Sequence, residues 1–151
     1  MNCIIVDDEP VARKGMKSLI EQVSQLELAG SFNSAIAASA FMNEHTVDLI
    51  FLDIQMPELN GLEFSKMVDS RTRIVFTTAF GQYAIDGYRV NALDYLLKPI
   101  SYVDFLQAAN KALQWFELVQ KPEEIDSIFV KSDYKLVQVD LKKIMYIEGL
   151  K

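Results

Sequence analysis

Three acidic residues stand directly after short apolar runs, and together they could do chemistry. Asp7 and Asp8 follow the run 3–6, and Asp53 follows the run 49–52. Three carboxylates that lie close together cannot all stay ionised unless a cation balances them. An all-oxygen cluster favours a hard ion, and Mg²⁺ is usually held by a few carboxylates together with several waters. The pattern therefore predicts a Mg²⁺ site, provided that the fold brings the two runs side by side.

Hydroxyl groups and an ammonium group follow two later apolar runs. Thr77 and Thr78 stand at the end of the run that begins at residue 74, and Lys98 follows the run 94–97. Lys98 would place positive charge opposite the metal ion, so a carboxylate facing both could accept a phosphoryl group as an aspartyl phosphate. Positioning and charge compensation are the protein's part in such chemistry. Each of these residues alone could be an ordinary strand-end residue, but four strand ends with complementary chemistry favour a site.

Five apolar runs and the helical patterns between them would position these groups. The runs are residues 3–6, 26–32, 49–52, 74–77 and 94–97. Three of them are continuous and rich in Val, Ile, Leu or Phe, which is typical of strands buried on both faces. We therefore predict an α/β fold with a doubly wound five-stranded parallel sheet, strand order 2-1-3-4-5, and helices on both faces. Ligands of such sheets bind at the carboxyl ends of the strands.

Helix starts are marked by residues that suit the first turn or the cap. Pro10 suits the first turn of a helix that carries Met16, Leu19, Ile20 and Val23 at helical spacing. Further helices are predicted over residues 35–44 after Ser34, 61–68 after Asn60, 82–90, and from Ser101 to about Gln120. The last of these has an expected apolar stripe of Tyr102, Phe105, Ala109, Ala112, Phe116 and Val119.

Composition excludes several classes of protein. The chain has 151 residues, is half apolar and carries a net charge of −6, all of it within residues 1–120. This acidic part is a poor surface for nucleic acid. Cys3 has no partner for an internal disulfide, and His45 has no second His or Cys for a zinc site, so we expect an inert core thiol and a surface loop residue. The absence of an apolar span or signal peptide predicts a cytoplasmic protein without membrane contact.

The chain changes character after Pro122. Residues 121–126 read as a linker, and residues 127–151 read as a short C-terminal β segment, because Val137, Val139 and Leu141 alternate with polar residues. About 25 residues cannot bury a core of their own. We therefore expect the strands of this tail to pair with a second copy or a neighbouring molecule.

Four motifs in residues 1–120 resemble the receiver domain of two-component response regulators, the CheY-like family. They are "VDDEP", "LDIQMPELNG", "FTTA" and "DYLLKP", in this order and at the expected spacing. The resemblance implies that Asp53 is the phosphoacceptor of a histidine kinase. It also implies that Asp8 is the principal Mg²⁺ ligand, that Asp7 assists, and that the main-chain carbonyl of Gln55 is another ligand. Lys98 would bind the phosphate.

The same resemblance implies a conformational switch. Thr78 matches the hydroxyl that moves toward the phosphate, and Tyr95 matches the aromatic residue that turns into the vacated space. The alternative for Tyr95 is an ordinary half-buried strand tyrosine. Gln55 and Phe80 would line the approach of water and tune phosphate lifetime. The resemblance further implies a cis bond between Lys98 and the following proline and turn roles for Pro57 and Gly61.

The tail resembles the opening of a LytTR-type DNA-binding domain. Only about a quarter of such a domain is present, so DNA binding would require the complete output domain. Four lysines of the tail are expected to be a solvated surface: Lys131, Lys135, Lys142 and Lys143. We also predict a phosphorylation-linked homodimer through the fourth helix, fifth strand and last helix, where Trp115 and Leu118 lie off the apolar stripe.

The residues also leave two alternative functions to be considered, a phosphatase and a docking module. A phosphatase with an Asp nucleophile usually needs a second Asp two positions later, but Gln55 stands there, so we do not expect an enzyme in the ordinary sense. A docking module that is never phosphorylated would have no need of the complete set of site residues. We therefore favour a phosphorylation-controlled regulator of transcription.

Overall fold

The computed structural model describes residues 1–79 and 92–120 of the chain. The chain divides into two compact units, Met1–Phe116 and Glu117–Lys151, and the whole sheet belongs to the first. The predicted fourth helix, the linker, the tail and Phe80 lie outside the described residues. The domain boundaries proposed from the sequence therefore stay predictions.

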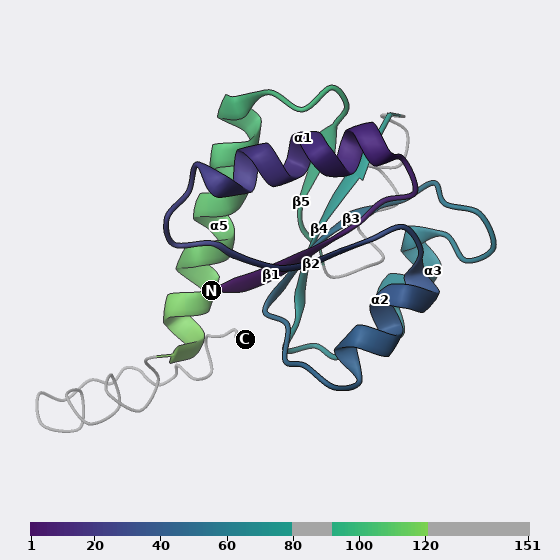
Figure 1. Cartoon of the computed structure of the whole chain (residues 1–151). Helices are drawn as coiled ribbons and strands as arrows, with labels where there is room; N and C mark the ends of the chain where they lie inside the picture. The colour runs from purple at the N-terminus through teal and green to yellow at the C-terminus, as the bar shows by residue number, and fades with distance from the viewer. Residues whose placement is uncertain (80–91, 121–151) are drawn as a thin grey trace, which may run out of the picture. The chain divides into compact units, whose positions relative to one another are not determined.

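The first unit is built on a five-stranded parallel sheet (Figure 1). Its strands are β1 (Asn2–Val6), β2 (Glu27–Phe32), β3 (Leu49–Asp53), β4 (Arg73–Thr78) and β5 (Ala92–Leu97). They are hydrogen-bonded in the order β2-β1-β3-β4-β5, with every pair parallel. The fold class and strand order predicted from the apolar runs are confirmed.

Helices cover both faces of this sheet. Figure 1 shows α1 (Pro10–Glu21) and α5 (Tyr102–Gln120) on one face and α2 (Ala35–Met42) and α3 (Gly61–Ser65) on the other. Strand residues alternate between two core clusters, so that Ile5 and Phe51 pack with α1 and α5 while Ile4 and Ile50 pack with α2 and α3. Burial on both faces explains why the runs of β1, β3 and β4 are continuously apolar, whereas the edge strand β2 is not buried in this way.

The predicted caps are present at three helix starts. Ser34 Oγ accepts from the N–H of Ala37 at 3.1 Å, Asn60 Oδ1 from Glu63 at 2.9 Å, and Ser101 Oγ from Asp104 at 3.1 Å. Each bond satisfies one backbone donor that the first turn leaves without a partner. Local sequence chemistry therefore sets these boundaries correctly.

Three helix predictions need correction. The helix after Ser34 ends at Met42 and not at residue 44, with Asn43 as its C-cap. The helix after Asn60 ends at Ser65 and not at residue 68, because the N–H groups of Lys66 and Met67 bond to carbonyls three residues back and tighten the chain into a turn. Tyr102 was expected in the apolar stripe but is 45% exposed. It is the first residue of α5, where the stripe runs beyond the core cluster that holds Phe105.

The remaining composition predictions concern single residues and membrane spans. Cys3 is fully buried, and burial raises the pKa of its thiol to about 12, so it is an inert core residue at neutral pH. His45 is exposed and its ring stacks on Phe41 at 4.1 Å. Within residues 1–79 and 92–120, no helix is long and apolar enough to cross a membrane.

Candidate functional site

The acidic residues predicted to form a cluster do come together at the carboxyl edge of the sheet. β1 and β3 are parallel neighbours, so Asp7, directly after β1, lies near Asp53, the last residue of β3. One oxygen of each of Asp7, Asp8 and Asp53 lies within 4.8 Å of the others. Asp7 and Asp53 are buried, and Asp8 is half-buried. Three hard oxygen donors at this spacing fit a Mg²⁺ ion.

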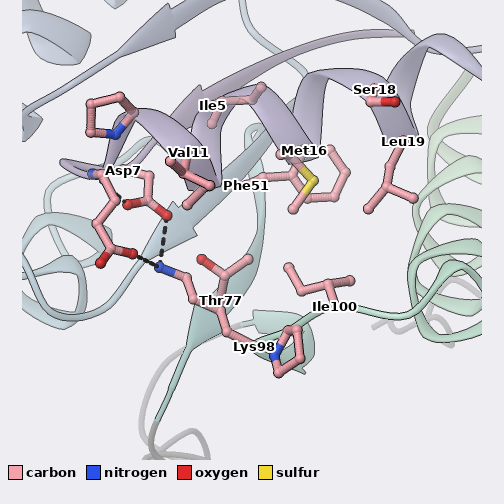
Figure 2. Close-up of a pocket in the computed structure, with 15 residues that line it drawn as sticks. Ile5, Asp7, Val11, Met16, Ser18, Leu19, Phe51, Thr77, Lys98 and Ile100 are labelled. Carbon is pink, nitrogen blue, oxygen red and sulfur yellow. Dashed lines mark hydrogen bonds and ion pairs between the residues drawn. The ribbon is translucent and has the colours of Figure 1, made fainter.

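Lys98 supplies the positive charge of the site. It follows β5, and its N–H donates to the carbonyl of Thr78 at 2.8 Å. Its Nζ lies 2.9 Å from Asp7 Oδ2, 3.3 Å from Glu9 Oε1 and 3.6 Å from Asp53 Oδ2. Figure 2 shows its bond to Asp7 as a dashed line. Burial alone would lower the pKa of Lys98, but its hydrogen bond with Asp7 and the charge of Asp53 raise it above the usual value.

Asp53 is a carboxylate whose surroundings disfavour its ionised form. Its side chain is only 5% exposed. Burial and the charge of Asp7 raise the pKa of Asp53 to about 7, against the opposing charge of Lys98 and a 3.3 Å bond from the N–H of Gln55. The single ammonium of Lys98 is thus too little cation for these carboxylates. An added cation would restore the charge balance.

The two threonines of β4 lie on opposite sides of the sheet. Thr77 pairs with Asp53 in the ladder and lies beside Lys98 in Figure 2. Thr78 is the next residue, so it shares its side of the strand with Phe76. Tyr95 is half-buried and stacks on Phe76 at a centroid distance of 5.2 Å. Thr78 and Tyr95 are therefore placed toward the same core cluster.

The loop after Asp53 is held by a close backbone approach. The N–H of Gly61 donates to the carbonyl of Ile54 at 2.8 Å, and the N–H of Ile54 donates to Thr77 at 3.0 Å. A Cβ on Gly61 would collide with the main-chain oxygen of Asp53 and lie 2.9 Å from the Cα of Ile54. Glycine is therefore required here, because only a residue without a side chain lets the loop pack this closely against the backbone of Asp53.

The sequence predicted one further feature of the site correctly and missed two residues that contact it. The bond from Lys98 to Pro99 is cis, as the resemblance implied. Glu9 and Arg13 were missed, although Arg13 Nη1 donates to the carbonyl of Asp7 at 2.7 Å. The only signal for Glu9 was its place next to Asp8, and nothing local shows that its side chain reaches β5.

A cavity of about 710 Å³ lies next to the site, between α1 and the segment after β5 (Figure 2). Asp7, Glu9 and Lys98 form its polar end. Apolar side chains form much of the remaining wall, among them Val11, Met16, Leu19, Phe51 and Ile100. The charged edge of the sheet therefore borders an apolar groove along α1.

Comparisons with known proteins agree on one family. The model of the response regulator receiver domain matches residues 3–110. An uncharacterised response regulatory protein of Vibrio parahaemolyticus is 36% identical over 138 residues, which are 85% of this chain and 57% of the relative. The transcriptional regulatory protein BtsR of Escherichia coli is 43% identical over 99 residues, which are 64% of this chain and 41% of BtsR. The chain thus spans about half the length of these relatives.

Two solved structures show the same fold. The response regulatory domain of protein mrkE from Klebsiella pneumoniae superposes with a TM-score of 0.72 at 33% identity. The similarity covers 78% of this chain and 98% of that domain. The REC domain of AraT from Geobacillus stearothermophilus gives a TM-score of 0.70 at 26% identity, covering 80% of this chain and 98% of that domain.

Proposed function

Because the chain belongs to the response regulator receiver domain family of two-component signalling, we propose that Asp53 accepts a phosphoryl group in a Mg²⁺-dependent reaction. Response regulators are generally phosphorylated by histidine kinases, and a histidine kinase is the proposed donor here. The observation that carries the proposal is the position of Asp53. It is a buried carboxylate within 3.6 Å of the Lys98 ammonium and within 4.8 Å of two further carboxylates.

In the proposed reaction a carboxylate oxygen of Asp53 attacks the phosphorus atom, and the bond from phosphorus to the donor's leaving group breaks. Mg²⁺ bound by Asp7, Asp8, Asp53 and the carbonyl of Gln55 would supply positive charge to the phosphoryl oxygens. Lys98 would bond one of these oxygens in the product. The raised pKa of Asp53 supports the need for added positive charge, because only the ionised carboxylate is a nucleophile.

We further propose that Thr78 and Tyr95 report the phosphate to the surface. The hydroxyl of Thr78 would bond a phosphoryl oxygen, and Tyr95 would move with it. Support comes from their placement toward one core cluster, where Tyr95 stacks on Phe76. A two-state element that both the phosphate and a partner can bias is the physical requirement for such a switch.

The proposed output is transcription control. BtsR is named a transcriptional regulatory protein, and the receiver matches less than half of it. We propose that residues 127–151 begin a LytTR-type DNA-binding domain, that DNA is bound only by the complete domain, and that the protein is cytoplasmic. Homodimerisation through the last helices and the tail is part of the same proposal.

Phosphatase chemistry is less well supported. An Asp-nucleophile phosphatase needs an acid or base close to the acceptor. The residue two positions after Asp53 is Gln55, whose amide cannot act as a general acid or base at neutral pH. The family is one of signalling regulators. A slow loss of phosphate from Asp53 is expected, but turnover of a general phosphate ester is not.

Intact-mass spectrometry after treatment with acetyl phosphate tests the assignment. Wild-type protein should gain one phosphoryl group with Mg²⁺ and none with EDTA, and Asp53→Asn should gain none. Asp48→Asn is a matched control. It removes a carboxylate directly before β3, at the end of the strand opposite to Asp53, and it keeps an oxygen that can accept the bond from the N–H of Asn2. Equal labelling of Asp53→Asn and wild type would refute Asp53 as the acceptor. An unlabelled wild type would favour the docking module.

A further inference from the structure

Glu9 occupies the cap position of α1 without capping the helix. Its side chain makes no bond to the first-turn N–H groups. Ser, Thr, Asp and Asn are the usual residues at this position because their short side chains reach those donors. The carboxylate of Glu9 instead extends to the residue directly after β5, where its Oε1 lies 3.3 Å from Lys98 Nζ. A residue in a helix-cap position therefore contacts the lysine of the phosphorylation site.

The contact matters because it helps to decide where the ammonium of Lys98 points. Its hydrogen bonds are to Asp7 at 2.9 Å and Glu9 at 3.3 Å, both at the start of α1. Asp53 Oδ2 is 3.6 Å away, beyond hydrogen-bond distance. The proposed acceptor thus feels the charge of Lys98 but does not receive its hydrogen bond.

Of the two carboxylates that hold Lys98, Glu9 is the one that can release it. Asp7 is buried, and its Oδ1 accepts from the N–H of Glu9 at 3.0 Å while its carbonyl accepts from Arg13. The side chain of Glu9 is 65% exposed, and its ion pair with Lys98 is therefore open to solvent. An exposed ion pair is weak and exchanges readily with water.

We propose that Glu9 is a positioning residue that holds Lys98 toward α1 in the unphosphorylated protein and competes with the phosphoryl group for its ammonium. This inference rests on the proposed function of Asp53. The bond between Lys98 and Glu9 must break, or lengthen, for Lys98 to bond a phosphoryl oxygen on Asp53. Glu9 therefore lowers both the rate of phosphorylation and the fraction phosphorylated at a given donor concentration.

Two variants separate this role from simple repulsion between Glu9 and an anionic donor. Glu9→Gln removes the charge, whereas Glu9→Asp keeps the charge on a side chain one methylene shorter, which cannot reach Lys98 in the same way. A competing contact predicts that both variants are phosphorylated faster than wild type, by roughly two- to fivefold for an exposed pair. Pure repulsion predicts that only Glu9→Gln is faster. Glu44→Gln, an exposed acidic residue elsewhere, is the control for net charge.

The rate experiment uses the full chain with acetyl phosphate and Mg²⁺ and follows the added mass over time. A second measurement needs no phosphate: Lys98 is labelled with limiting acetic anhydride, and its acetylated fraction is quantified by peptide mass spectrometry. Labelling should rise by roughly twofold or more in both Glu9 variants and stay unchanged in Glu44→Gln.

The outcomes are distinguishable. Wild-type phosphorylation rates in Glu9→Asp, or wild-type labelling of Lys98 in both Glu9 variants, overturn the proposal. If the wild-type protein takes up no phosphoryl group, the proposed function of Asp53 fails. The acetylation measurement then still decides whether Glu9 holds the ammonium of Lys98.

Discussion

The two ends of the parallel sheet differ in how their polar side chains are paired. At the amino end, polar groups are paired with one another: the N–H of Asn2 donates to Asp48 Oδ2 at 3.0 Å, and the N–H of Asp48 donates to Asn2 Oδ1 at 2.9 Å. Thr72 Oγ1 donates to the carbonyl of Val47 at 2.7 Å. At the carboxyl end, three carboxylates lie within 4.8 Å and Lys98 is their nearby cation. The polar groups at the amino end thus satisfy one another by hydrogen bonds, whereas the carboxyl end has an excess of negative charge.

This difference teaches how a single fold can hold a reactive site. Reciprocal hydrogen bonds satisfy the part-buried donors and acceptors of Asn2 and Asp48, so this pair contributes to stability at the amino end. Crowded carboxylates cost stability until a cation or a proton arrives, and the raised pKa of Asp53 is the sign of that cost. Perturbed groups of this kind gather at functional sites. Three changes test the comparison, from the largest expected effect to the smallest.

Gly61→Ala should have the largest effect on stability, because the new Cβ collides with backbone atoms at the carboxyl end. We expect a loss of about 3 kcal/mol in the free energy of unfolding, since backbone cannot move aside as a flexible side chain would. Gly15→Ala is the matched control: a Cβ at Gly15 meets nothing within 4 Å, and alanine in a helix should add about 0.5–1 kcal/mol. Urea unfolding measures both. Equal stability of the two variants would show that the loop after Asp53 relaxes freely.

Asp53→Asn should stabilise the metal-free protein at pH 8 by on the order of 2 kcal/mol, because it removes a charge that the site does not balance. The pKa of Asp53 is about 7 in the folded protein against 3.8 for an ordinary aspartate. Between these values the folded state binds more protons than the unfolded state, so wild-type stability rises as the pH falls from 7 toward 4. The advantage of Asp53→Asn should shrink over the same range.

Urea unfolding in EDTA at pH 8, 6 and 4.5 checks this dependence. Asp48→Asn should show no comparable gain, because Asp48 belongs to a satisfied pair at the amino end. A stabilisation by Asp53→Asn that is absent, or that stays constant with pH, would contradict the charge imbalance at the carboxyl end.

Asp48→Ala should destabilise the protein by about 1–2 kcal/mol, because the N–H of Asn2 loses its acceptor. Asp48→Asn keeps an oxygen acceptor and should lose less than half as much. Neither variant should change Mg²⁺ affinity, measured by isothermal titration calorimetry. A weakened Mg²⁺ affinity in Asp48→Ala would mean that the two ends of the sheet are coupled.

Much of this protein follows from local sequence chemistry. Five apolar runs predicted the five strands and, through the rules for parallel sheets, their order. Three of the runs are continuous because strands buried on both faces have no polar side. Ser34, Asn60 and Ser101 marked helix starts, since one side-chain oxygen satisfies a nearby backbone donor. Asp7 and Asp53 could be placed at one edge because each follows a strand. Such features depend on residues close in sequence or on the shared direction of neighbouring strands.

Tertiary structure decided what depends on distance between separate elements. The distances from the Lys98 ammonium to Asp7, Glu9 and Asp53 follow from side-chain positions at the ends of β1, β3 and β5. No spacing along the chain reveals them. The collision that makes Gly61 necessary and the pKa of Asp53 depend on burial and on neighbours from other strands. Sequence thus determined which chemical groups reach the carboxyl edge, whereas packing determined their charge state and which of them hold one another, because both vary steeply with distance and burial.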